Sequence, residues 1–166
     1  MTDDKNIVVR SQMIPLDGIR LVLPNTAIAE IIVVPQIDKL EDTPEWVVGA
    51  LTWRDLQIPL IAFEMAAEYQ THLPTIDKRS RIIILNTISG SENLPFYALI
   101  AQGLPRLLAI DHANTQDAPE QMETKPFELR HIIVDGNLAI IPDQQALEGA
   151  ITNLGLTVKD SSSESL

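Results

Sequence analysis

One pattern occurs twice in this chain, and it limits the folds that the chain can adopt. From Leu51 the sequence predicts a strand, a tight turn at residues 54–55, a second strand and a helix. From Ile132 it predicts the same order, with the turn at residues 135–136. Self-similarity of this kind indicates a duplicated structural unit, here one built mainly of strands. We therefore expect two similar small barrels packed together.

Short apolar segments bounded by proline, glycine or asparagine support this expectation, because such segments favour strands over helices. The pair of strands at 19–23 and 28–34 also parallels the pair at 96–101 and 104–110. Two segments predict helices, 64–70 and 143–151, the second with Asp143 as its N-cap. The expected strands are 7–14, 19–23, 28–34, 46–53, 57–61, 81–85, 96–101, 104–110, 129–134 and 138–141. This fold class is all-β with short helices.

The domain organisation follows from the same pattern. We expect one folded region, residues 7–155, made of two barrel subdomains that interweave near residues 70–80. Residues 111–126 are polar and contain proline, so we expect an exposed loop in the second unit. Residues 157–166 are acidic and rich in serine, and we expect them to form a disordered tail.

Charge and composition exclude several classes of function. The net charge is −11, which disfavours nucleic acids and anionic lipid as partners because both need clustered basic residues. The chain has no cysteine, so disulfides and thiolate chemistry are excluded. No apolar run is long enough to span a bilayer, and the N-terminus does not have the layout of a signal peptide. We expect a cytoplasmic protein that does not span a membrane.

Signatures of catalysis are missing from the sequence. There is no HExxH motif, no glycine-rich phosphate loop and no nucleophile elbow. The histidines are scattered, and His131 is expected to be a half-buried residue of a strand. Asp111, His112, Asp117 and Glu120 could form a metal site, but a loop of mixed polar residues is more often only solvated, and the solvated loop is favoured. We therefore expect no catalytic residue, no metal and no cofactor.

Surface features remain, and the first lies on the strand at 28–34. Strict alternation places Ile28, Glu30, Ile32 and Val34 on one face. A carboxylate among isoleucines is destabilising if it is buried without a partner. Glu30 therefore either reaches water at the rim of a barrel or provides a charged anchor in an apolar interface.

The second surface feature is the charged turn between two apolar runs. Arg54 is either an ordinary residue of an exposed hairpin or a contact residue beside Trp53, since arginine and tryptophan are both enriched at binding hot spots. Asp55 takes the position that Gly136 has in the second copy. Turns of two residues often need positive φ, which glycine adopts more readily than aspartate.

At these residues the chain resembles the CheW family of chemotaxis coupling proteins. The stretch TPEWVVGALTWRDLQIPLIAF is similar to a family segment with matching positions at Pro44, Gly49, Arg54 and residues 58–60. AIAEII resembles the family's "V-x-E-I" strand, ALIAQGLPRLLAI its second-barrel hairpin, and GNLAIIPDQQAL its closing strand and helix. The resemblance covers roughly residues 7 to 150.

The resemblance implies two packed five-stranded SH3-like β-barrels and an adaptor without catalysis. Such an adaptor bridges the cytoplasmic tip of a chemoreceptor and a CheA-type histidine kinase. The residues expected at these contacts, or supporting them, are Ile28, Glu30, Gly49, Trp53, Arg54 and Leu107.

Departures from the family pattern alter the charge near these surfaces. Asp55 replaces a usual glycine, Gln102 a usual aspartate, and Arg106 stands where an acidic residue is common; Trp53 is also less usual. In this respect the chain looks more like the divergent CheW-like proteins of type IV pilus (twitching) systems, the PilI and ChpC types. Two alternatives stay open: a small-ligand sensor or barrel enzyme using the loop around His112, and an accessory CheW-like protein that binds only one partner.

Overall fold

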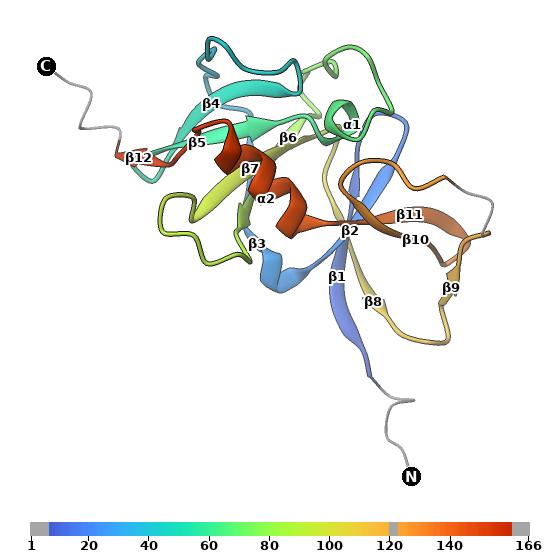
Figure 1. The fold of residues 1–166 in the computed structure, drawn as a ribbon. Helices are drawn as coiled ribbons and strands as arrows, with labels where there is room; N and C mark the ends of the chain where they lie inside the picture. The colour runs from blue at the N-terminus through green and yellow to red at the C-terminus, as the bar shows by residue number, and fades with distance from the viewer. Residues whose placement is uncertain (1–6, 120–122, 161–166) are drawn as a thin grey trace, which may run out of the picture.

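The computed structural model describes residues 7–119 and 123–160. In this part of the chain, strands form two packed sheets, and a single longer helix lies against them (Figure 1). The predicted fold class, mostly β with short helices, is therefore confirmed. No helix among the described residues is long and apolar enough to cross a membrane.

The first sheet has the order β12-β5-β7-β6-β3, with β4 paired to β5. Strands β5 and β7 run parallel, joining Leu60 to Ala98, while the other pairs are antiparallel. The strands of this sheet are β3 (Ile28–Val33), β4 (Val47–Trp53), β5 (Leu56–Ile61), β6 (Arg81–Asn86), β7 (Phe96–Ala101) and β12 (Lys159–Asp160).

The second sheet has the order β8-β1-β2-β11-β10-β9. It also contains one parallel pair, β2 with β11, which joins Leu21 to Ile140. Its strands are β1 (Val9–Pro15), β2 (Arg20–Pro24), β8 (Arg106–Ile110), β9 (Thr115–Asp117), β10 (Glu128–Val134) and β11 (Asn137–Pro142). Strand β9 lies inside the segment that the sequence predicts to be a loop.

The two sheets share one plan, as the repeated pattern predicts. The order β4-β5-β7-β6-β3 in the first matches β10-β11-β2-β1-β8 in the second. Both hairpin turns have two residues with positive φ: 49° and 63° at Arg54 and Asp55, and 50° and 80° at Asp135 and Gly136. A short helix follows each hairpin, α1 (Phe63–Ala66) or α2 (Gln144–Asn153).

The chain passes between the sheets at three places, and none is the expected one; the last is the connection through α2 from β11 to β12. Because β1 and β2 belong to the second sheet, the chain enters the first at the 3-10 turn η2 (Asn25–Ala27) and leaves it after β7, at residues 102–105. Residues 67–80 connect α1 to β6 within the first sheet. The prediction that the barrels interweave near 70–80 is therefore corrected.

The helices differ in how well the sequence predicts them. Helix α2 begins as expected, because the Asp143 carboxylate accepts a hydrogen bond from the Ala146 N–H at 3.1 Å. Helix α1 is shorter than predicted and ends at Ala66. Glu68 adopts a left-handed φ of 65°, which no residue inside an α-helix has, and this stops the helix there.

Three apolar clusters hold the fold together. The largest lies between the two sheets and α2 and contains Tyr97 and Phe63. The second cluster fills the barrel that the first sheet forms, called the first barrel below, and Trp53 is its largest member. The second sheet likewise forms the second barrel. The third, inside the second barrel, is smaller; its buried members are Met13, Val22, Ile132, Val134 and Ala139.

Residues 157–160, which the sequence predicts to belong to a disordered tail, are instead held in place by contacts with the rest of the chain. The Val158 N–H donates to the Asn93 carbonyl at 2.8 Å, and β12 pairs Lys159 with Gln57 of β5. Val158 also packs partly buried against the first two clusters, so apolar contact fixes this segment. Residues 161–166 lie outside the described residues.

Candidate functional site

At the β4–β5 hairpin, two neighbouring side chains point in different directions. Trp53 points into the core and Arg54 points to the surface. Strand β4 ends with Trp53, which is 6% exposed. The left-handed turn then directs Arg54 outward, where its side chain is 67% exposed. A charged pair can therefore interrupt two apolar runs at this point, since the chain turns at the pair.

Arg54 makes two contacts on this surface. Its guanidinium Nη2 lies 2.8 Å from Oε1 of Glu30 on β3, forming an ion pair. Its Cζ lies 4.5 Å from the centroid of the Trp53 ring, a distance typical of a cation–π contact. We call Glu30, Trp53 and Arg54 the arginine cluster. An exposed ion pair contributes only about 0–1 kcal/mol to stability, so these contacts mainly orient the guanidinium.

An aromatic contact supports the cluster from below. The Phe96 ring of β7 meets the Trp53 indole edge to face, with centroids 4.9 Å apart and planes at 70°. Such pairs add roughly 0.5–1.5 kcal/mol beyond the burial of area. The sequence reasoning missed Phe96, because nothing in a local pattern pairs two strands that are 43 residues apart.

A β-bulge at Ala29 changes the predicted alternation on β3. Ile28 pairs with Leu85 and Glu30 with Ile84, so Ala29 is the extra residue. Ile28 therefore packs against the cluster between the sheets, whereas Ile32 packs inside the first barrel. The prediction that Ile28 shares a face with Glu30 and Ile32 is wrong for Ile28.

Gly49 is where two backbones meet. A Cβ on Gly49 would lie 2.3 Å from the carbonyl oxygen of Asp38. Asp38 and Ala50 exchange two backbone hydrogen bonds of 2.8 Å at this point. Gly49 therefore shapes the strand that carries Trp53.

Leu107 belongs to a different surface from the arginine cluster. It lies on β8, the edge strand of the second sheet, and is 72% exposed. Leu104, in the connection that precedes β8, is 67% exposed. The structure thus gathers Glu30, Trp53 and Arg54, but it places Leu107 on the other barrel.

A buried carboxylate links the two barrels. Glu64 of α1 is fully buried, and its Oε2 accepts the Asp17 N–H of the β1–β2 turn at 2.9 Å. Its Oε1 is buried without a hydrogen-bond partner in the described structure. Burial raises the pKa of the Glu64 carboxyl above its usual 4.5.

We expect this buried carboxyl to make stability depend on pH. Because its folded-state pKa is raised, the folded protein holds the proton more tightly than the unfolded chain. Stability is therefore lost as pH rises above 4.5 through the raised pKa. The Glu64→Gln variant lacks this titration, so the unfolding free energy of wild type should fall relative to it as pH rises above 4.5. Urea unfolding of both proteins measures this; a difference that stays constant with pH would contradict the assignment.

A second polar link joins Tyr69, in the segment that follows α1, to β10. The Tyr69 hydroxyl donates to the Glu128 carboxylate and lies 3.3 Å from His131 Nε2, which is itself 2.9 Å from Glu128. Burial and Glu128 raise the pKa of Tyr69. The His131 side chain is 7% exposed, so this histidine is more buried than its predicted half-buried position in a strand.

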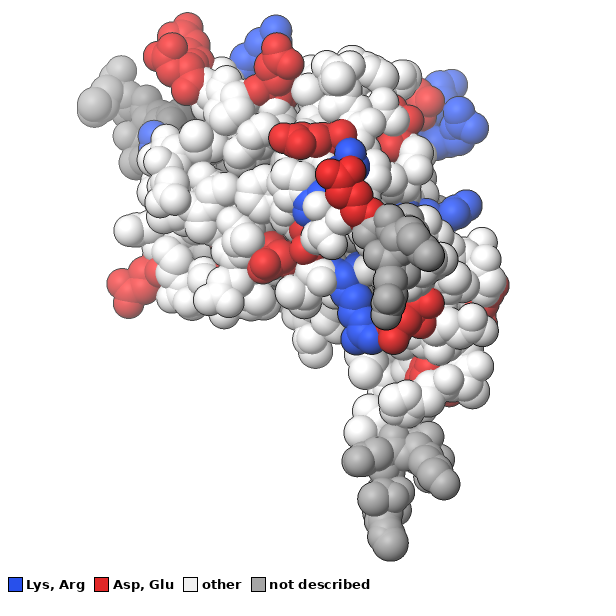
Figure 2. All heavy atoms as spheres, turned by 45° about the vertical axis from the view of Figure 1, so that its right-hand side comes forward, with Lys and Arg blue, Asp and Glu red and all other residues white. Residues whose placement is uncertain are grey.

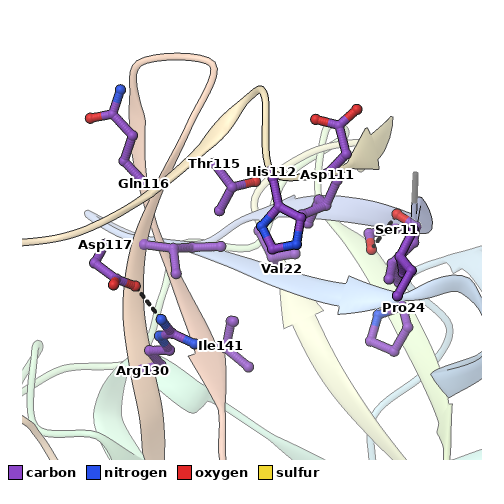
Figure 3. Close-up of a pocket in the computed structure, with 14 residues that line it drawn as sticks. Ser11, Val22, Pro24, Asp111, His112, Thr115, Gln116, Asp117, Arg130 and Ile141 are labelled. Carbon is purple, nitrogen blue, oxygen red and sulfur yellow. Dashed lines mark hydrogen bonds and ion pairs between the residues drawn. The ribbon is translucent and has the colours of Figure 1, made fainter. Parts of the chain in front are cut away.

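A cavity of about 620 Å³ opens at one end of the second barrel. Figure 3 shows its polar groups: the Arg130–Asp117 ion pair lies on one side, Ser11 on the other, and the His112 ring projects between them. Among the described residues no three His, Cys, Asp or Glu side chains are grouped so as to hold a metal. Glu120 lies outside the described residues.

Acidic and basic side chains are interspersed over the face that Figure 2 shows. Acidic and basic side chains also form ion pairs among the described residues. Besides Arg54–Glu30, Arg79 lies 3.6 Å from Asp77, and Arg130 pairs with Asp117. Within the described residues of this face, basic groups do not merge into one broad patch.

Comparison with known proteins places this geometry in a family. The model of the CheW-like domain matches residues 11–150. Among solved structures, the chain is similar to the crystal structure of the scaffolding protein TtCheW from Thermoanaerobacter tengcongensis, with a TM-score of 0.67 and 20% sequence identity, over 86% of this chain and 88% of that one. A search of curated proteins finds no match.

Proposed function

The chain belongs to the CheW-like domain family, and we propose on that basis that it is a non-catalytic chemosensory adaptor. In this proposal it acts in the cytoplasm and couples the cytoplasmic tip of a chemoreceptor to a CheA-type histidine kinase. The observation that carries the proposal is the arginine cluster, a solvent-facing guanidinium oriented by an indole and a carboxylate.

The arginine cluster has the chemistry of a protein contact. A guanidinium presents several donors in one plane, and Arg54 uses Nη2 on Glu30. The Arg54 side chain is 67% exposed, so a partner can reach the guanidinium. The contact between the buried Trp53 indole and the partly buried Phe96 ring provides a rigid base, so a partner would bind with little ordering cost.

A second surface on the other barrel would allow two partners to bind at once. Leu104 and Leu107 are both more than 60% exposed on or beside an edge strand. Exposed apolar side chains of this kind suit the apolar face of a helix. We propose that these leucines contact the receptor and that the arginine cluster contacts the kinase.

Arg54→Ala should weaken partner binding without unfolding the protein. We expect a loss of roughly 1–3 kcal/mol in the binding of at least one partner, the range of an interface hot spot. Stability should change by less than about 1 kcal/mol, since only an exposed ion pair is lost. Calorimetry with a purified kinase or receptor fragment measures the first, and thermal unfolding the second.

Arg79→Ala is the matched control for this test. Arg79 is also exposed and also pairs with an acidic side chain, that of Asp77, but it lies outside the arginine cluster. The control should bind both partners like wild type. Equal binding by Arg54→Ala and wild type would remove Arg54 from the interface.

A second candidate is an accessory protein that binds only one partner. Two departures favour it: Asp55 adds a negative charge to the turn beside Arg54, and Arg106 places a cation on the edge strand that carries Leu107. Either change would weaken one of the two contacts. A role in type IV pilus (twitching) control is proposed on the same departures.

A further inference from the structure

The interior of the second barrel is less completely filled than that of the first. The first barrel buries an indole and five bulky aliphatic side chains on β4, β5 and β6, whereas the largest buried side chains of the second are Met13 and Ile132. Leu108, Ile110 and Ile141 pack only partly buried around this small core. The cavity of about 620 Å³ is the space left at the open end.

The walls of the cavity are mainly apolar. Val9, Val22, Ile110, Ile132 and Ile141 come from five different strands and enclose it. A volume of this size falls within the range of sites for small organic molecules, and such sites are mostly apolar with a few polar groups. The lining therefore favours a ligand whose body is apolar.

Polar side chains line the opening of the cavity, called the rim below, and the charged ones already have partners within the protein. Arg130 and Asp117 neutralise each other. The Asp111 carboxylate accepts the N–H groups of Ala113 and Asn114, and Figure 3 shows it turned away from His112. A hydroxyl at Ser11 and the imidazole of His112 also line the opening.

We propose that this cavity binds an uncharged small molecule with an apolar body and one hydrogen-bonding head. The body would lie against Val22 and Ile132, and the head would meet the rim at His112 and Arg130. A carboxylate head would instead compete with Asp117 for Arg130 and approach a chain of net charge −11. The site is separate from the arginine cluster, so it can be tested on the protein alone.

Titration with 1-octanol and with octanoate tests the proposal, because these probes share a chain and differ in charge. NMR of the full chain should show saturable shifts at Val22, Ile132 and Ile141 with octanol. Octanoate should bind at least about tenfold more weakly than octanol, which is equivalent to a loss of about 1.4 kcal/mol or more in binding free energy. Equal or tighter binding of octanoate would overturn the choice of an uncharged head. Shifts that do not saturate, or that occur elsewhere, would overturn the site.

Two variants make the location testable. Val9→Trp places an indole at a position that is 45% exposed at the mouth, and it should abolish the octanol shifts. Leu129→Trp is the control, because Leu129 is 66% exposed on β10 and does not line the cavity; it should bind octanol like wild type. Should Val9→Trp fail to fold, Ile141→Phe fills the cavity from another wall. Octanol binding that survives in a folded cavity-filling variant would overturn the proposal.

Discussion

Gly49→Ala is expected to destabilise the protein by about 3–5 kcal/mol, the cost of overpacking added to that of backbone strain. The new Cβ would lie 2.3 Å from the Asp38 carbonyl oxygen and 3.0 Å from the Ile37 side chain. The Asp38 backbone cannot move away cheaply, because it exchanges two hydrogen bonds of 2.8 Å with Ala50. The φ of Gly49, 154°, adds strain for any residue with a side chain. Urea unfolding followed by circular dichroism measures the effect.

Gly136→Ala separates backbone strain from steric clash. Gly136 also has positive φ, 80°, but no atom lies within 4 Å of the position its Cβ would take. This control should cost only about 1 kcal/mol, the penalty of a left-handed residue. Similar losses in the two variants would show that the approach of Asp38 to Gly49 is not what requires the glycine.

Glu148→Ala should also cause a large loss of stability, about 2–4 kcal/mol. This carboxylate of α2 is 1% exposed and accepts the N–H of Ile88 at 3.0 Å and that of Ser89 at 2.9 Å. Hydrogen bonds to a charged group are the stronger ones, and their loss leaves two amides without these acceptors. Because α2 covers the cluster between the sheets, we also expect the β6–β7 connection to loosen.

Amide hydrogen exchange tests that local effect. Ile88 and Ser89 should exchange much faster in Glu148→Ala, while the β4–β5 hairpin keeps its protection. Glu148→Gln retains one acceptor oxygen and should lose less stability than Glu148→Ala. Unchanged exchange at Ile88 and Ser89 in Glu148→Ala would contradict the role given to this carboxylate.

Local sequence signals account for much of the fold. Each hairpin turn could be predicted because Arg54-Asp55 and Asp135-Gly136 interrupt apolar runs, and the cap at Asp143 is a short-range contact. The repeat also predicted which strands correspond, since it aligns 19–34 with 96–110. All these features depend on neighbours in the sequence.

The parts that could not be predicted depend on neighbours in space. Whether β1 and β2 join the first or the second sheet is decided by packing, and no residue of either strand encodes it locally. The bulge at Ala29 arises from its register with β6, so alternation alone misplaced Ile28. The same reason explains why the approach of the Asp38 backbone to Gly49 and the pairing of Lys159 with Gln57 could not be predicted.

In the candidate site, too, the sequence predicts the features that depend on neighbouring residues in the chain but not those that depend on contacts in space. The sequence identified Arg54, Trp53 and Glu30 as unusual, because charged residues and an indole stood in apolar runs. It could not show that the Glu30 carboxylate lies 2.8 Å from Arg54, 24 residues away. The cavity was likewise beyond prediction, since it results from a core too small for its barrel.

The central claim is that this chain bridges two partners through two surfaces. Its most direct test is a pull-down from native lysate with wild type, Arg54→Ala and Arg79→Ala side by side, with bound proteins identified by mass spectrometry. We predict that wild type and Arg79→Ala recover both a chemoreceptor and a CheA-type kinase, and that Arg54→Ala recovers less of at least one of them. Recovery of a single partner would contradict bridging and favour the accessory role, and recovery of neither would contradict the adaptor function itself.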